Sequence, residues 1–261
     1  METRTQLGQN RTGTQMSPVD TADMLRGADD IADAIEPTDV DAALVSGDTR
    51  GDLADAQLRE SYAGEADPLG SVPLPATLTG VAKSGAALLT GKRPQVLMDK
   101  LGERLAFERA GVRLYDALLV KCRAAQDSGL EDGELSMLSY FRDQEAQHFE
   151  MVAAVLLDLG GDPTAQTPCA DLVGVEGAGL VQAMNDPRTS LLQSLHVMLD
   201  AELIDNASWE LLIRLARAAG HGGIAERFEA ALQQEAAHLR TLKDLVGKLT
   251  LQDAGVADRM M

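Results

Sequence analysis

The sequence is poor in several features, and each shortage argues against a class of protein. Only two of the 261 residues are cysteines, Cys122 and Cys169, so we expect reduced thiols rather than a disulfide framework. Basic residues number 23 against 41 acidic ones, giving a net charge of −18, whereas a nucleic-acid partner or an anionic membrane calls for a basic surface. Aromatic residues make up only 3% of the chain, so we expect a core of Leu, Ala and Val, which suits helices.

Long apolar runs are also missing. The smoothest apolar stretch, 69–91, is interrupted by Pro73, Pro75 and Lys83, so no transmembrane helix is predicted. The opening residues METRTQLGQN contain no apolar segment typical of a secretory signal. We therefore expect a cytoplasmic protein.

The first 70 residues form an acidic extension in which acidic residues outnumber basic ones about threefold. Its apolar stripes last only a turn or two, too little apolar surface to offset the entropy of ordering. We predict that residues 1–70 are largely disordered, with 18–35 and 38–45 as candidates for short helices. An interaction tail that folds on a protein partner is the alternative. Residues 71–94 are small, apolar and broken by Pro and Gly, and a linker, a strap on the next domain and a docking peptide all stay open.

From residue 95 onward, apolar residues recur at the i, i+3, i+4, i+7 spacing of amphipathic helices. Four long helices are predicted, over 95–126, 131–159, 189–219 and 224–249. Short breaks join the first helix to the second and the third to the fourth, so each pair forms an antiparallel hairpin. A loop-like stretch over 161–187 allows a crossover between the hairpins. The sequence therefore predicts an all-α fold, an antiparallel four-helix bundle with one long crossover over 95–250, followed by a tail over 251–261.

The two predicted hairpins resemble one another. The second helix contains Gln-Glu-Ala-Gln-His at 144–148, and the fourth contains Gln-Glu-Ala-Ala-His at 234–238. The first and third helices match at an offset of 94 residues. The matched pairs are Leu105 with Leu199, Glu108 with Glu202, Tyr115 with Trp209, Asp116 with Glu210, and Leu118 with Leu212. These matches indicate an internal repeat that includes the residues best suited to chemistry.

Two Glu-x-x-His pairs fall within the apolar stripes of their helices rather than on the solvated faces. Glu and His three residues apart share a helix face, so each pair can reach one ion. A carboxylate buried there without a counter-charge costs on the order of several kcal/mol. The first and third helices offer few Lys or Arg residues on the matching stripe, and they add the acids Glu108 and Glu202. Such carboxylates repel one another unless cations lie among them, so we predict metal binding.

One Glu from each of two helices and a Glu-x-x-His pair from each of the other two is a ligand pattern of di-metal carboxylate proteins. On these residues, over about 95–250, the chain resembles the ferritin-like superfamily, in particular the di-iron proteins around ferritin, bacterioferritin and rubrerythrin. Tyr115, seven residues after Glu108, is a further familiar feature of that superfamily.

The resemblance implies a role for each matching residue. The implied ligands are the terminal carboxylates Glu108 and Glu202, the bridging carboxylates Glu145 and Glu235, and the imidazoles of His148 and His238. Asp205 shares a face with Glu202 and is an additional candidate, as in some rubrerythrin-like relatives. Two iron ions, or alternatively two manganese ions, are the implied cofactors, because carboxylate-rich sites with one imidazole per metal suit them.

The function that the resemblance implies is oxidation of Fe(II), or reduction of O₂ or peroxide, in a homo-oligomer. The thiolate iron centre of a full rubrerythrin is not expected, because neither cysteine has a C-x-x-C partner. The alternative is an accessory or cargo module whose tail docks on a partner, with a structural or relic metal site. We do not expect ligands at His196, His221, Glu103 or Glu150, which fall off the stripe or in a turn.

Overall fold

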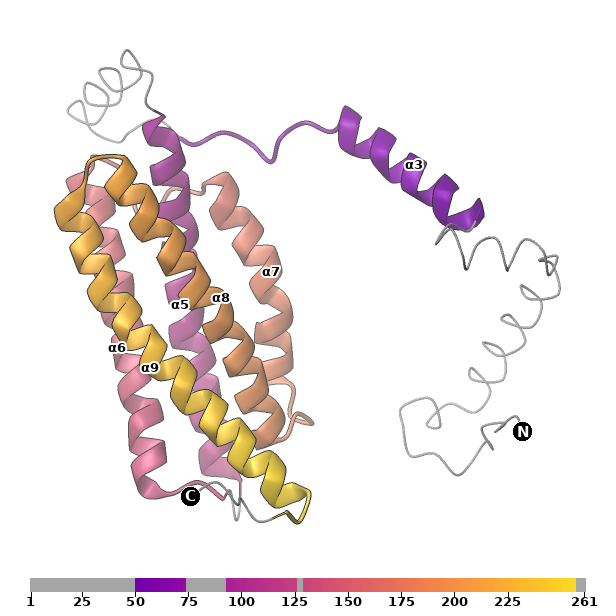
Figure 1. Ribbon diagram of the computed structural model, residues 1–261, viewed down its shortest axis with the longest axis vertical. Helices are drawn as coiled ribbons and strands as arrows, with labels where there is room; N and C mark the ends of the chain where they lie inside the picture. Colours follow the sequence, from indigo (N-terminus) through magenta and orange to yellow (C-terminus); the bar gives the residue numbers. More distant parts are fainter. Residues whose placement is uncertain (1–49, 74–92, 126–128, 257–261) are drawn as a thin grey trace. The chain divides into compact units, whose positions relative to one another are not determined.

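All regular structure in the described residues is helical. The computed structural model describes residues 50–73, 93–125 and 129–256. The helices in these ranges are α3 (Arg50–Glu65), α5 (Pro94–Ala124), α6 (Asp132–Asp158), α7 (Pro168–Asn185), α8 (Leu191–Ala218) and α9 (Gly222–Asp253) (Figure 1). The predicted all-α class is therefore confirmed for this part of the chain. None of these helices is both long and apolar enough to cross a membrane.

The four long predicted helices correspond to α5, α6, α8 and α9, with ends that differ from the prediction by a few residues. Local signals explain where they begin and end. Ser190 and Gln193 form a capping box at the start of α8, each side chain accepting a hydrogen bond from the other residue's backbone N–H. Gly160 and Gly220, with φ of 88° and 89°, follow α6 and α8 in the left-handed conformation that commonly ends a helix.

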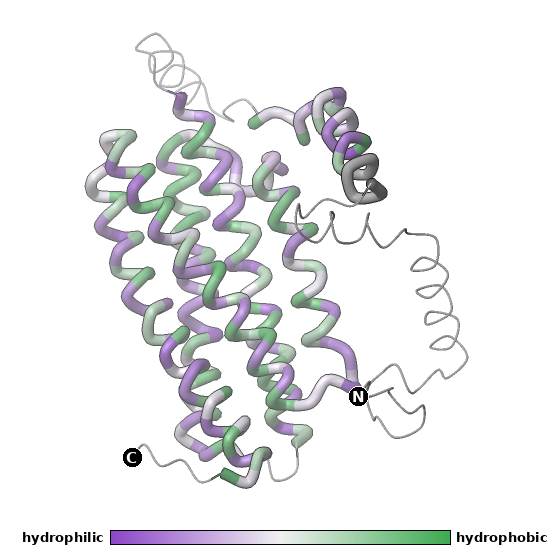
Figure 2. Tube along the Cα trace, turned by 45° about the vertical axis from the view of Figure 1, so that its right-hand side comes forward, coloured by the Kyte–Doolittle hydropathy of each residue, from purple (hydrophilic) through white to green (hydrophobic). Residues whose placement is uncertain are grey.

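Five helices pack together lengthwise. Helix α5 packs against α6, α7 and α8, and α9 packs against α8 and α6. Consecutive helices run in opposite directions along the long axis, so α7 carries the chain back along the length of α5 before α8 begins (Figure 1). Along α5, α6, α8 and α9, polar and apolar residues are interspersed, as the predicted helical spacing requires (Figure 2).

Helix α7 corrects the prediction of a loop over 161–187. The Thr167 hydroxyl accepts a hydrogen bond from the backbone N–H of Ala170, and Pro168 occupies a first-turn position where a missing N–H costs nothing. Val173 and Met184 are buried against the bundle. Packing on α5 and α8 thus outweighs the poor helix propensity of the glycines in this segment.

The bundle core has two apolar halves. One half contains Leu97, Val152, Trp209 and Phe228, and the other contains Leu118, Leu138, Leu195 and Leu242. Along α6, α8 and α9, the predicted site residues lie between the segments that supply the two halves, and on α5 Glu108 lies where one half gives way to the other. The fold therefore places these polar residues near the middle of the bundle, where water is excluded.

Helix α3 belongs to a separate unit of the chain, which ends at Asp67. Its presence was not expected in an extension predicted to be largely disordered. All its described side chains are exposed, including Leu58 and Tyr62 at 50% and 63%. The candidate helices over 18–35 and 38–45 lie outside the described residues, as does most of 71–94.

Candidate metal centre

Six residues predicted from the sequence meet inside the bundle. Helix α5 supplies Glu108, α6 supplies Glu145 and His148, α8 supplies Glu202, and α9 supplies Glu235 and His238. None of these residues is more than 3% exposed. Pairing of Glu and His at i, i+3 on α6 and α9 places both groups of each motif on the inward face.

The six residues form two overlapping groups, each suited to one ion. Glu108, Glu145, His148 and Glu235 have ligand atoms within 4.8 Å of one another. The same holds for Glu145, Glu202, Glu235 and His238. Glu145 and Glu235 belong to both groups, so each can offer a carboxylate to two neighbouring positions.

The histidine rings are oriented by glutamines on opposite helices. His148 Nε2 lies 2.7 Å from Gln234 Oε1, and His238 Nε2 lies 2.9 Å from Gln144 Oε1. Gln144 belongs to the α6 motif and contacts the histidine of α9, and Gln234 belongs to the α9 motif and contacts the histidine of α6. The two contacts are therefore reciprocal. In a neutral ring, Nε2–H then donates to the amide oxygen and Nδ1 keeps its lone pair.

That lone pair faces the carboxylates. His148 Nδ1 lies 2.6 Å from Glu235 Oε1, and His238 Nδ1 lies 3.0 Å from Glu235 Oε2. Among the described residues, both Nδ1 atoms and both Glu235 oxygens are buried without a hydrogen bond of suitable geometry. Two acceptors held this close need a shared cation or a proton between them.

Two hydrogen-bond donors fix the α8 side of the cluster. The Tyr115 hydroxyl donates to Glu202 Oε1 at 2.5 Å, across from α5 to α8. Asn206 Nδ2 donates to the backbone carbonyls of Glu202 and Glu235, which ties α8 to α9 beside the cluster. Glu202 is therefore held by a neutral donor.

Arg104 is a buried cation on the inward stripe of α5, where few Lys or Arg residues were expected. Its guanidinium is 2% exposed, places Nε 2.9 Å from Glu108 Oε1, and forms an ion pair with Asp205. It also lies over the rings of Phe107 and Trp209, at 4.6 and 5.4 Å from the ring centroids. Its position four residues before Glu108 is the sequence signal that could have found it.

Asp205 lies beside the cluster but in neither group of ligand atoms. Its carboxylate pairs with Arg104, and its backbone carbonyl lies 3.4 Å from Arg104 Nη1. These contacts hold Arg104 of α5 against α8.

Burial dominates the protonation chemistry of the cluster. It raises the pKa of Glu108 and Glu235 well above the ordinary range and that of Glu145 to about 7, and neighbouring carboxylates add to each shift. Burial also lowers the pKa of His148 to about 4, so its ring is neutral at pH 7. Burial lowers the pKa of His238 too, but contacts with Glu145 and Glu202 outweigh it and raise that pKa to about 9. The cluster is thus short of positive charge.

The residues not expected as ligands lie apart from the cluster. His196 and Glu150 are exposed, His221 lies at the turn before α9, and Glu103 pairs with Lys100. The two cysteines are free, with Cys122 buried and Cys169 half-buried.

Besides Arg104, sequence reasoning missed the roles of Gln144, Gln234 and Gly111. The glutamines stood in both repeated motifs, and that repetition was the available signal. A Cβ added at Gly111 on α5 would lie 2.2 Å from Glu145 Oε2, so the missing side chain makes room for that carboxylate. No sequence pattern reveals such a cross-helix approach.

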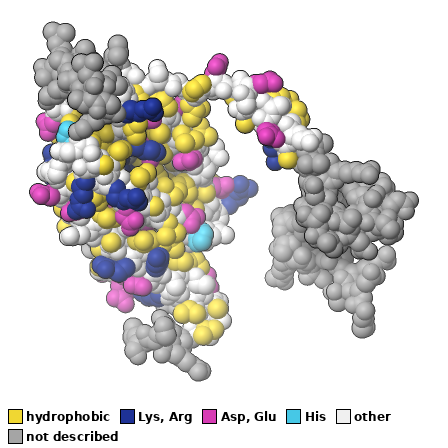
Figure 3. All heavy atoms as spheres, turned by 45° about the horizontal axis from the view of Figure 1, so that its top comes forward, with side chains coloured by type: hydrophobic (Ala, Val, Ile, Leu, Met, Phe, Trp, Pro, Cys, Tyr) yellow, Lys and Arg dark blue, Asp and Glu magenta, His cyan; other side chains and the backbone are white. Residues whose placement is uncertain are grey.

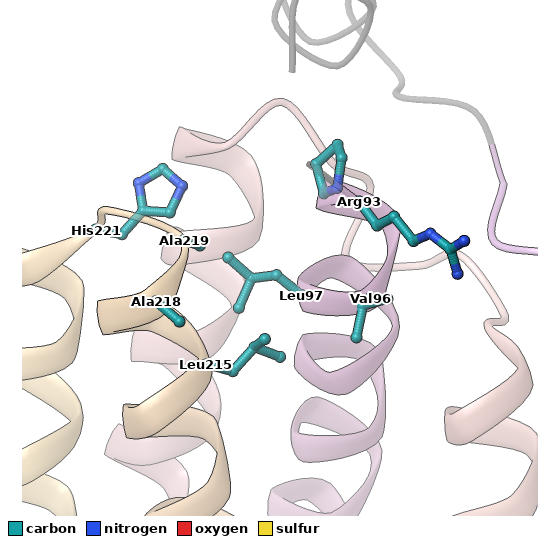
Figure 4. Close-up of a pocket in the computed structure, with 8 residues that line it drawn as sticks. Arg93, Val96, Leu97, Leu215, Ala218, Ala219 and His221 are labelled. Atoms are coloured by element: carbon teal, nitrogen blue, oxygen red, sulfur yellow. The ribbon is translucent and has the colours of Figure 1, made fainter. Parts of the chain in front are cut away.

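A pocket at the end of the bundle is separate from the cluster. Its apolar lining includes Leu97 of α5 and Leu215 of α8, which point toward one another, whereas the Arg93 side chain extends away (Figure 4). None of the six cluster residues lines it. Elsewhere on the surface shown in Figure 3, apolar side chains are interspersed with charged ones.

Comparison with known proteins adds no relative: no family model, no curated protein and no solved structure matches this chain.

Proposed function

We propose that the bundle is a ferritin-like four-helix fold with a di-metal carboxylate centre, and that the protein is an oxidoreductase. The observation that carries the proposal is the overlap of the two ligand groups through Glu145 and Glu235. A chance collection of buried acids has no reason to form two equivalent sets that share two members. The proposed crossover is the segment containing α7, which lies between the two hairpins.

The charge of the cluster fits two divalent cations. Five buried carboxylates and one buried guanidinium leave four negative charges when every acid is ionised and both imidazoles are neutral. Two divalent ions balance these charges. The donor set is mainly carboxylate with one imidazole per position, which suits Fe(II) or Mn(II). The five carboxylates are Glu108, Glu145, Glu202, Asp205 and Glu235.

Each residue of the cluster has a defined role in this proposal. Glu108 and Glu202 would each hold one ion, Glu145 and Glu235 would hold both, and His148 and His238 would each give one Nδ1. Gln144 and Gln234 hold the rings through Nε2, which keeps Nδ1 available as a ligand. The two apolar halves of the core exclude water on both sides.

Two such ions, when bound, would supply electrons to O₂ or peroxide within the bundle. We therefore propose oxidation of Fe(II), or reduction of O₂ or peroxide, as the reaction class. A homo-oligomer and a cytoplasmic location stay predictions.

The proposal is tested by adding Fe(II) to the metal-depleted protein in air. The expected result is oxidation faster than in protein-free buffer, followed by absorbance of the ferric product. Glu145→Ala should lower this rate to the background, because it removes a carboxylate shared by both positions. Glu150→Ala, an exposed acid on the same helix, is the matched control. An identical rate in wild type and Glu145→Ala would contradict the proposal.

A second candidate function is an accessory or cargo module that docks through its N-terminal extension. The exposed side chains of Leu58 and Tyr62 on α3 favour it, because a partner could cover them. Deletion of residues 1–67 should then abolish partner capture while leaving Fe(II) oxidation unchanged. Capture that survives the deletion would contradict the docking role.

A further inference from the structure

The two halves of the cluster have the same ligands but different neighbours. Helices α5 and α8 correspond at an offset of 94 residues, which matches Glu108 with Glu202. Four residues before these acids stand Arg104 in one helix and Met198 in the other. A cation therefore occupies only one of two equivalent positions.

The contacts follow this difference. Arg104 Nε lies 2.9 Å from Glu108 Oε1, and neither residue is more than 2% exposed. Glu202 instead accepts a hydrogen bond from the Tyr115 hydroxyl at 2.5 Å. Glu108 thus contacts a permanent positive charge from outside the ligand set. Glu202 contacts the neutral Tyr115 hydroxyl, and its nearest imidazole, His238 Nδ1 at 3.6 Å, is itself one of the proposed ligands.

The position of Arg104 is fixed from several sides. It pairs with Asp205 of α8, donates toward the Asp205 backbone carbonyl, and lies against Phe107 and Trp209. A guanidinium held in this way does not swing out when an ion arrives. It also keeps its proton, because no side chain in a protein deprotonates arginine at neutral pH.

A fixed guanidinium affects a neighbouring ion in two ways. It competes for Glu108 Oε1, and it repels a divalent cation through a water-poor interior where charges are weakly screened. Both effects act on the position formed by Glu108 and His148 more than on the position formed by Glu202 and His238.

We propose that the two metal positions bind with unequal affinity, that the Glu202–His238 position fills first, and that Arg104 is the positioning residue that weakens the Glu108–His148 position. This inference rests on the proposed di-metal function. It adds an order of loading and the residue that sets it.

The test is an anaerobic titration of the metal-depleted full chain with Co(II), followed by its visible absorbance and by calorimetry. Wild type should show two binding steps whose dissociation constants differ tenfold or more. His148→Ala should remove the weaker step, and His238→Ala should remove the tighter one. The opposite assignment, or two steps of equal affinity, would overturn the inference while leaving a di-metal site in place. Absence of any Co(II) binding would instead overturn the proposed function itself.

The role of Arg104 is tested by Arg104→Met, which takes the residue found at the matching position of α8. Because this change leaves Asp205 without its cation, the double variant Arg104→Met/Asp205→Asn is measured as well. The double variant removes one positive and one negative charge, so the net charge of the cluster stays the same. A change in the ratio of the two dissociation constants then reflects the loss of the charged groups beside Glu108 and not a change in net charge. We expect that ratio to fall below threefold in both variants, with helical circular dichroism retained. A ratio that stays tenfold or more in the folded double variant would refute the role of Arg104.

Discussion

The orientation of each imidazole depends on one residue of the opposite helix. Gln144 of α6 contacts His238 of α9, and Gln234 of α9 contacts His148 of α6. Without the amide oxygen, the ring can rotate or take the other tautomer, and Nδ1 no longer faces the carboxylates. Residues that orient a ligand in this way typically change metal affinity 10–100-fold when mutated.

Gln144→Ala should therefore weaken metal binding by about 10–100-fold, measured by competition with a chromophoric chelator. Gln144→Glu keeps an acceptor for His238 Nε2 and should restore most of the affinity. Gln147→Ala is the matched control, because Gln147 lies in the same motif but is exposed. Equal affinities in Gln144→Ala and Gln147→Ala would show that the contact does not position the ring.

Gly111 offers a variant that should weaken metal binding while the helix is kept. A Cβ there would lie 2.2 Å from Glu145 Oε2, which forces the Glu145 carboxylate to move. Alanine also favours the helix over glycine by about 1 kcal/mol. We expect Gly111→Ala to lower metal affinity at least tenfold, with the helical fold retained.

The control for Gly111→Ala is Gly247→Ala on α9, where nothing lies within 4 Å of an added Cβ. That variant should raise the melting temperature and leave metal affinity unchanged. If the two alanine variants bind metal equally well, the space above Gly111 has no role in seating Glu145.

At the scale of the element, helix α7 shows how tertiary packing overrides local sequence. Gly174 and Gly177 lie within it, and Pro168 begins it. These residues led to the prediction of a loop because glycine and proline have low helix propensity and the sequence does not reveal packing. The buried contacts of Val173 and Met184 supply what propensity lacks.

If α7 is a stable helix, Gly174→Ala should stabilise the protein by about 0.5–1 kcal/mol, because Gly174 is helical and nothing lies within 4 Å of an added Cβ. The measurement is chemical denaturation with far-UV circular dichroism. No gain in stability, or a loss, would mean that this segment is not helical in solution.

The difference between local sequence pattern and tertiary packing also explains how much of the site could be predicted. Periodic apolar residues located α5, α6, α8 and α9, and repeated Glu-x-x-His pairs located the cluster. The two glutamines escaped because their partners lie on the opposite helix, and contacts between helices leave no periodic signal. Arg104 was overlooked although Glu108 follows it at i+4 on the same helix, and only its pairing with Asp205 of α8 leaves no trace in the sequence. Helix α3 escaped because its described side chains are all exposed, so no buried stripe marks it.

At the scale of the whole molecule, the unusual feature is the charge buried in the bundle interior. The chain carries a net charge of −18. In the part of the chain that the structure describes, five carboxylates and one guanidinium lie buried between the two apolar halves of the core. Burying this much unbalanced charge is costly, and divalent ions offset the cost. If the proposed ions bind, they would stabilise the folded state through mass action.

Elemental analysis of freshly purified protein, expressed as a metal-to-protein ratio, shows whether the cluster holds two ions. We predict two transition-metal ions per chain, iron or manganese, in wild type and in Glu150→Ala, and a ratio near zero in Glu145→Ala. A wild-type chain that stays free of metal after purification, and after anaerobic incubation with Fe(II) or Mn(II), would contradict the account.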